Sequence, residues 1–126
     1  MIPGIRTGNL MFDCADAEAL CAFYAEMLHW ERCMLYGLPG VRSSEGEMYL
    51  FAQEPDYVPP VWPEKPGMQQ KQIHIDYQVP DVATAVAEAE RLGAVKAEEQ
   101  YGGDDFVTML DPAGHPFCLC CADNQP

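Results

Sequence analysis

The sequence has few basic residues and no long apolar run. Seven Lys and Arg stand against twenty Asp and Glu, which gives a formal net charge of −13. This charge would repel a phosphate backbone or an anionic membrane surface, so we expect neither a nucleic acid nor a membrane as a partner. No apolar stretch approaches the roughly 20 residues of a spanning helix. The opening segment MIPGIRTGNLMF lacks the apolar core of a secretory signal. We therefore expect a cytoplasmic protein.

Cysteine is present, but not in the pattern of a disulfide framework. Three of the six cysteines crowd together at Cys118, Cys120 and Cys121, whereas disulfide-linked domains space their cysteines along the chain. Thiols in the cytosol stay reduced, and we expect most of these to be small core residues. With 48% hydrophobic residues over 126 positions, the chain has the composition of one globular domain.

A proline-rich connector divides the chain near its midpoint. Residues 54–67 contain five prolines, and proline neither donates a backbone hydrogen bond nor continues a helix or a central strand. Apolar residues within the segment, Trp62 among them, predict that the connector is ordered. It separates two modules, at about residues 5–53 and 71–123.

The two modules share a repeated pattern. Residues 9–16 align with residues 74–81 at an offset of 65, and each segment ends in an aspartate, Asp16 or Asp81, that can cap a helix. Apolar residues then recur at helical spacing as far as His29 in the first module and Gly93 in the second, where we expect the helices to stop. Three strand candidates follow each helix, at residues 30–36, 41–44 and 48–53 and at residues 95–100, 106–110 and 116–121. The pattern predicts β-α-β-β-β in each module.

Four stretches of the sequence carry further motifs: FDCADAEALCAFYAEMLHW at 12–30, VWPE at 61–64, IHIDYQVPDVATAVAEAERLGA at 73–94 and DPAGHPFCL at 111–119. With the repeat, they resemble the vicinal oxygen chelate superfamily, and its glyoxalase-like branch in particular. This superfamily includes glyoxalase I, extradiol dioxygenases, fosfomycin-modifying enzymes and bleomycin-resistance proteins. The resemblance implies an α+β fold in which two tandem βαβββ modules form a cupped mixed sheet. It also implies a single domain over residues 1–126 that assembles as a homodimer.

The resemblance further implies where a metal would bind. Members of the superfamily take ligands from the first and last strands of each module, and these positions correspond to Asn9, Leu50, His74 and Cys118. Leucine cannot ligate a metal and asparagine offers only a neutral amide oxygen, whereas a catalytic zinc needs three protein ligands. The two glutamates that glyoxalase I chemistry uses are also missing from these positions. We therefore expect neither a metal at this set nor standard glyoxalase I activity.

Strand alternation predicts a polar wall. Asn9 and Asp13 share one face of the first strand, and His74, Asp76 and Gln78 share the corresponding face of its counterpart. Polar groups along an otherwise buried face are typical of a ligand-binding surface. Three more positions complete the expected ligand-cavity set, which is Asn9, Asp13, Leu50, Trp62, His74, Asp76, Gln78 and Cys118.

Two residues of this set have several interpretations. His74 is a hydrogen-bonded cavity residue, or a ligand contact and general acid–base partnered by Asp76, or the anchor of a rearranged metal centre. Such a centre would add Asp76, Asp13 or Cys118 and take zinc, nickel, iron or manganese. Trp62 either stacks on a flat or cationic ligand or anchors the connector.

These observations predict a glyoxalase-like protein whose metal site is degenerate. We expect this protein to bind a small molecule, such as an antibiotic or a metabolite. The acidic charge and the resemblance to bleomycin-resistance proteins favour a cationic or aromatic ligand. The alternative is a metal-dependent lyase, isomerase or dioxygenase with a rearranged centre around His74. A third interpretation is an interaction module that has lost its ligand. The protein is an enzyme only under the second interpretation.

Overall fold

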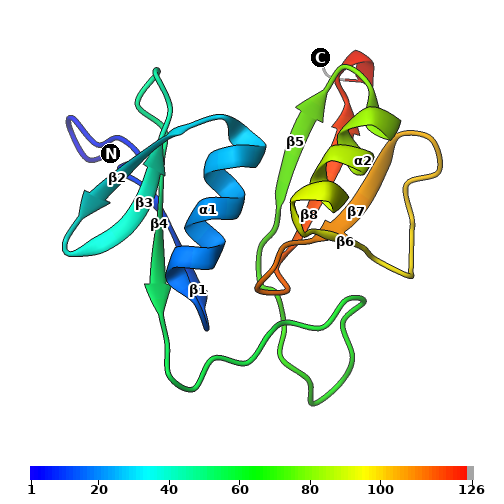
Figure 1. The fold of residues 1–126 in the computed structure, drawn as a ribbon, viewed down its shortest axis with the longest axis horizontal. Coiled ribbons are helices and arrows are strands. Elements are labelled where there is room, and N and C mark those ends of the chain that lie inside the picture. The colour runs from blue at the N-terminus through cyan, green and yellow to red at the C-terminus, as the bar shows by residue number, and fades with distance from the viewer. Residues whose placement is uncertain (125–126) are drawn as a thin grey trace. The chain divides into compact units, whose positions relative to one another are not determined.

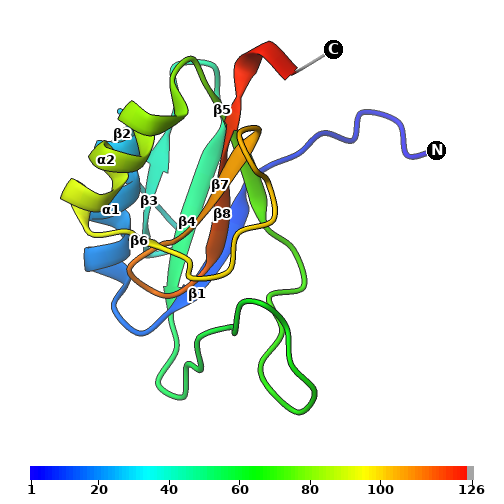
Figure 2. The ribbon, with the colours of Figure 1, turned by 90° about the vertical axis from the view of Figure 1, so that its right-hand side faces the viewer.

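The computed structural model describes residues 1–124, and the chain divides into two compact units between Tyr57 and Val58. Each unit contains one βαβββ module, so the predicted α+β repeat is confirmed. In both modules the helix lies along one face of the sheet of its own module (Figures 1 and 2). No helix within the described part of the chain is both long and apolar enough to cross a membrane.

The first module forms a four-stranded mixed sheet with the strand order β1-β4-β3-β2. β1 and β4 are parallel, and the other neighbours are antiparallel. The elements are β1 (Leu10–Cys14), α1 (Ala17–Leu28), β2 (Glu31–Leu35), β3 (Leu38–Arg42) and β4 (Met48–Gln53).

The second module repeats this topology with the strand order β5-β8-β7-β6, and β5 and β8 are again parallel. A short 3₁₀ turn, Ala122–Asn124, follows its last strand. The elements are β5 (Ile75–Val79), α2 (Val82–Leu92), β6 (Val95–Lys96), β7 (Phe106–Leu110) and β8 (Pro116–Cys121).

Both helices begin and end where the sequence predicts. Asp16 Oδ1 accepts a hydrogen bond from the Ala19 amide at 3.0 Å, and Asp81 Oδ1 accepts one at 3.0 Å in the second module. Each aspartate thereby satisfies an amide that the first helical turn leaves unpaired. At the other end, His29 and Gly93 adopt left-handed backbone angles, with φ of 56° and 117°. The aspartate caps and both helix stops are confirmed.

Two predicted strands differ from the structure. The strand expected at residues 41–44 is β3 at 38–42, because Tyr36 and Gly37 form the preceding turn with φ of 56° and 76°. The strand expected at 95–100 is only β6, at 95–96. Beyond it, the Ala97 amide still donates to the Thr108 carbonyl at 3.0 Å, and the Gln100 side chain bonds this carbonyl and the Thr108 amide at 2.9 Å each. The strands expected at 48–53, 106–110 and 116–121 are confirmed as β4, β7 and β8.

The proline-rich connector is part of a longer irregular segment. Residues 54–74 contain no helix or strand, so irregular backbone extends beyond the predicted end of the connector at residue 67. The segment is nevertheless fixed by its own hydrogen bonds, since the Val61 amide donates to the Gln69 carbonyl at 3.0 Å. Its last residue, His74, leads directly into β5.

Candidate functional site

The candidate site lies on one face of the second sheet. In the first module, Phe12 of β1 packs against Tyr24 of α1 with ring centroids 5.2 Å apart, so Phe12 faces the helix. At the repeat offset of 65, the equivalent residue on β5 is Tyr77. Because side chains alternate along a strand, His74 and Asp76 occupy the opposite face, away from the helix.

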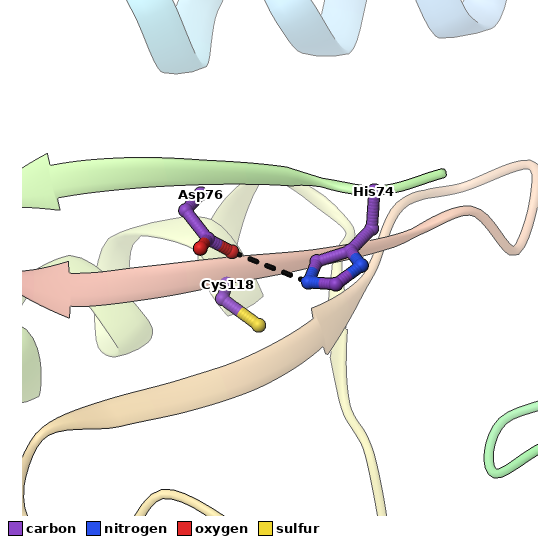
Figure 3. A group of neighbouring side chains, drawn as sticks. All are labelled: His74, Asp76 and Cys118. Atoms are coloured by element: carbon purple, nitrogen blue, oxygen red, sulfur yellow. Dashed lines mark ion pairs between the residues drawn. The ribbon is translucent and has the colours of Figure 1, made fainter. Parts of the chain in front are cut away.

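Three potential metal ligands meet on this face. His74 precedes β5, Asp76 lies on β5, and the parallel register pairs Asp76 with Cys118 on β8. His74 Nε2 lies 3.4 Å from Asp76 Oδ1, and one ligand atom from each of the three residues lies within 4.8 Å of the others. The three side chains point toward one another (Figure 3).

The cluster has a buried end and an open end. Cys118 is only 3% exposed, whereas the side chains of His74 and Asp76 are 35% and 60% exposed. A molecule or ion arriving from solvent would therefore meet the imidazole and the carboxylate first. The thiol forms the floor of the cluster.

Cys118 has a hydrogen-bonding neighbour on β7. The antiparallel register pairs it with Thr108, whose buried hydroxyl oxygen lies 3.4 Å from Cys118 Sγ. Burial raises the pKa of the Cys118 thiol; the Thr108 hydrogen bond opposes this rise and the Asp76 carboxylate adds to it. A thiol with a raised pKa is largely protonated at neutral pH and so is a poor nucleophile. The structure therefore gives no support to Cys118 as an attacking group.

Trp62 packs beside the cluster. Its ring centroid lies 6.3 Å from that of His74 and 5.9 Å from that of Tyr101. Trp62 Nε1 donates to the Glu99 carbonyl at 3.1 Å, which fixes the plane of the ring. Lys71 Nζ lies 5.0 Å from the ring centroid, within the range of a cation–π contact. These contacts hold Trp62 within the second unit.

The remaining predicted residues lie in different surroundings. Asn9 directly precedes β1 and donates to the Leu10 carbonyl at 3.3 Å. Asp13 is exposed on β1, and Leu50 is fully buried on β4. Gln78 is exposed on β5, one step further along the face that carries Asp76.

The register also relates the two sheets position by position. Met11 pairs with Leu50 in the first sheet as Asp76 pairs with Cys118 in the second. Leu50 and Cys118 are therefore equivalent, as the family resemblance implies. Because Leu50 has no donor atom and the Asn9 amide is neutral, the set of Asn9, Leu50, His74 and Cys118 does not fit a catalytic metal.

Sequence reasoning missed three residues around the site: Lys71, Tyr101 and Thr108. Lys71 and Tyr101 lie in irregular segments, where no periodic pattern marks a side chain. Lys71 pairs with Glu64 at 2.6 Å as well as lying over the Trp62 ring. Thr108 lies on a predicted strand, and a threonine between apolar residues was the one signal that could have indicated it.

Cys120 offers a test of the electrostatics of this face. Burial, followed by the Asp76 carboxylate, raises the pKa of Cys120 to about 11 from an ordinary value of 9.0. Because alkylation needs the thiolate, a rise of this size lowers the reactive fraction at pH 8 by about 100-fold. We expect iodoacetamide to modify Cys120 about 100-fold more slowly than a free thiol, as followed by peptide mass spectrometry. Modification at the rate of a model thiol would contradict the raised pKa.

Comparisons with known proteins agree with this architecture. The family model described as glyoxalase-like domain matches residues 9–120. No curated protein sequence matches the chain. Among solved structures, the chain is similar to a glyoxalase/dioxygenase from Nostoc punctiforme, with a TM-score of 0.68 and 18% identity over 96% of this chain and 94% of that one.

Two further structures show the same likeness. For a glyoxalase/bleomycin resistance protein from Albidiferax ferrireducens T118, the TM-score is 0.63 at 14% identity, over 95% of this chain and 98% of that one. For the trypanothione-dependent glyoxalase I of Leishmania major, it is 0.62 at 17% identity, over 95% and 88% of the respective chains. At these identities the structures establish the fold. Because the family model spans both βαβββ modules, this chain belongs to the glyoxalase-like domain family.

Proposed function

We propose that this glyoxalase-like protein binds a small cationic aromatic molecule on the face of the second sheet that carries His74 and Asp76. The observation that carries the proposal is the juxtaposition of an exposed carboxylate with an imidazole and an indole. Asp76 lies 3.4 Å from His74, and the His74 ring lies 6.3 Å from that of Trp62. Together they offer a cation an anionic partner and offer a flat ring a surface to contact.

The charges around the site favour a cation. Lys71 Nζ already occupies a cation–π position over the Trp62 ring at 5.0 Å, so the attraction for a further cation comes from Asp76 rather than from this face of the indole. The charge of Lys71 is itself offset by Glu64 at 2.6 Å. With a formal net charge of −13, the whole chain also concentrates cations near its surface. An anionic ligand would have to overcome this field.

Thermal unfolding tests the proposal with matched probes. We expect tryptamine and bleomycin-type glycopeptides to raise the melting temperature, following RT ln(1 + [L]/Kd). Indole-3-acetate, which has the same ring with a negative charge, should not. The Asp76→Asn variant should bind tryptamine about tenfold more weakly, the loss expected for about 1.4 kcal/mol of charge attraction.

Asp104→Asn is the control, because it makes the same charge change at an exposed residue of the second unit with no described contact to the cluster. It should bind tryptamine like the wild type. Equally weakened tryptamine binding in both variants would show that the effect comes from net charge alone. Absence of stabilisation by every cationic probe would reject the proposal.

A metal-dependent lyase, isomerase or dioxygenase is the second candidate. It is favoured by the grouping of His74, Asp76 and Cys118, whose ligand atoms lie within 4.8 Å of one another. Its test is turnover of glyoxalase-type thiohemiacetals and catechols by metal-loaded protein, with His74→Ala as the inactive variant. Turnover that is unchanged in His74→Ala would reject this candidate.

A further inference from the structure

We propose that His74, Asp76 and Cys118 form a zinc site built entirely within the second module. All three side chains belong to the second module: His74 directly precedes β5, Asp76 lies on β5 and Cys118 lies on β8. The inference rests on the second candidate function, which places a metal at the same three side chains. Zinc binding itself is tested without any organic ligand.

The geometry suits three ligands around one ion. Zinc lies about 2.0–2.3 Å from nitrogen, oxygen and sulfur ligands in a tetrahedron, which separates neighbouring ligand atoms by about 3.3–3.7 Å. The 3.4 Å between His74 Nε2 and Asp76 Oδ1 falls in this range. The two remaining distances, from Cys118 Sγ to His74 and to Asp76, are at most 4.8 Å, so each needs a contraction of no more than about 1.5 Å. Rotation of the two exposed side chains, His74 and Asp76, supplies such a movement.

The ligand types select the metal class. A thiolate with an imidazole and a carboxylate suits zinc, whereas magnesium, calcium and manganese prefer sites made of oxygen ligands. A thiolate and a carboxylate carry two negative charges, which a divalent ion balances. Three protein ligands leave one tetrahedral position open, and there a bound zinc acts as a Lewis acid toward an oxygen of water or of a ligand.

The repeat shows that the fold does not itself require polar residues here. The four second-module positions are His74, Asp76, Cys118 and Thr108, and the register relates them to Asn9, Met11, Leu50 and Gly40 in the first module. The last three of these first-module residues offer no side-chain ligand atom of the imidazole, carboxylate or thiol type. The first sheet nevertheless has the same topology. The polar cluster is therefore an addition to the architecture.

Thr108 acts in this proposal as a positioning residue. Its hydroxyl lies 3.4 Å from Cys118 Sγ and is buried, so it can donate to the sulfur and fix its direction. Outer partners of this kind contribute about 10–100-fold to metal affinity. We expect Thr108→Val, which keeps the shape and removes the hydroxyl, to weaken zinc binding by about tenfold.

The test is zinc stoichiometry and affinity of the full chain. Protein purified without a tag or chelator is loaded with zinc chloride, desalted and measured by elemental analysis, and the Kd follows from competition with a chromophoric chelator. We expect about one zinc per chain. An outer partner such as Thr108 contributes about 10–100-fold to zinc affinity. We expect a larger loss of zinc affinity in each ligand variant, His74→Ala, Asp76→Asn and Cys118→Ser.

Cys120→Ser and Asp104→Asn are the matched controls. Cys120 lies two residues beyond Cys118 on the same face of β8, and both controls should retain zinc at wild-type affinity. Because Cys118→Ser can perturb a buried position, cobalt substitution of the wild type provides a second readout. A thiolate-to-cobalt charge-transfer absorption is expected, and it should persist in Cys120→Ser.

Four outcomes would overturn the inference. They are less than about a tenth of an equivalent of zinc after loading, no charge-transfer absorption with cobalt, unchanged affinity in a folded Cys118→Ser variant, and equal loss in Cys120→Ser. Failure of the proposed function remains distinguishable. Zinc binding without stabilisation by tryptamine would support the metal site and reject the organic ligand site. Stabilisation by tryptamine without zinc binding would support only the organic ligand site.

Discussion

Replacing Asp111 by alanine is expected to lower the free energy of unfolding by about 3–5 kcal/mol. The Asp111 side chain is fully buried in the turn between β7 and β8. Its Oδ1 accepts from the amides of Ala113 at 2.8 Å and His115 at 3.0 Å, and its Oδ2 lies 2.8 Å from His115 Nδ1. The alanine variant loses these three interactions, which bind the half-buried residues Ala113 and His115 to the turn.

Urea unfolding followed by circular dichroism measures this loss. Asp111→Asn keeps an oxygen for the two backbone amides and removes the charge, so it should fall between the wild type and Asp111→Ala. Asp104→Ala removes an exposed carboxylate from the same unit and should change stability by less than about 0.5 kcal/mol. A cost for Asp111→Ala below about 1 kcal/mol would mean that the turn forms without its aspartate.

The turn matters to the candidate site through the two strands that it joins. β7 carries Thr108 and β8 carries Cys118, and their pairing brings the hydroxyl within 3.4 Å of the sulfur. The aspartate and the glycine of the DPAGH segment are therefore turn residues, with Gly114 at φ of 91°. These turn residues affect the site by fixing the register between β7 and β8. A variant that loosened this turn would misplace Cys118 without touching a ligand.

Local signals explain why much of the fold could be predicted. A capping aspartate bonds amides within its own helical turn, so the capping role of Asp16 and Asp81 can be predicted from nearby residues alone. Strand alternation likewise places His74 and Asp76 on one face, because it depends only on their spacing of two residues along the chain. The shortened β6 could not be predicted in this way, because the Thr108 amide bonds the side chain of Gln100, eight residues away, and strand alternation does not indicate such a contact.

The candidate site, too, is only partly predictable from local sequence signals. The meeting of Asp76 with Cys118 depends on parallel pairing of strands about 40 residues apart, which alternation alone does not specify. Family resemblance supplied Cys118, and the strand register then brought it to Asp76. Lys71 and Tyr101 reach Trp62 from irregular segments, so their positions follow only from the tertiary structure.

Phe51→Ala is the second change with a large expected effect, and it lies in the first module, which carries none of the proposed zinc ligands. Phe51 is fully buried on β4, and its ring centroid lies 5.6 Å from those of both Phe12 and Tyr24. Truncation leaves a cavity among stacked rings, so we expect a loss of about 3–5 kcal/mol in the free energy of unfolding.

Met34→Ala, at a residue of β2 that is 66% exposed, should cost less than about 1 kcal/mol. Phe51→Leu should recover part of the loss. Urea unfolding of the three variants decides the matter: equal costs for Phe51→Ala and Met34→Ala would show that the aromatic cluster does not stabilise the first module.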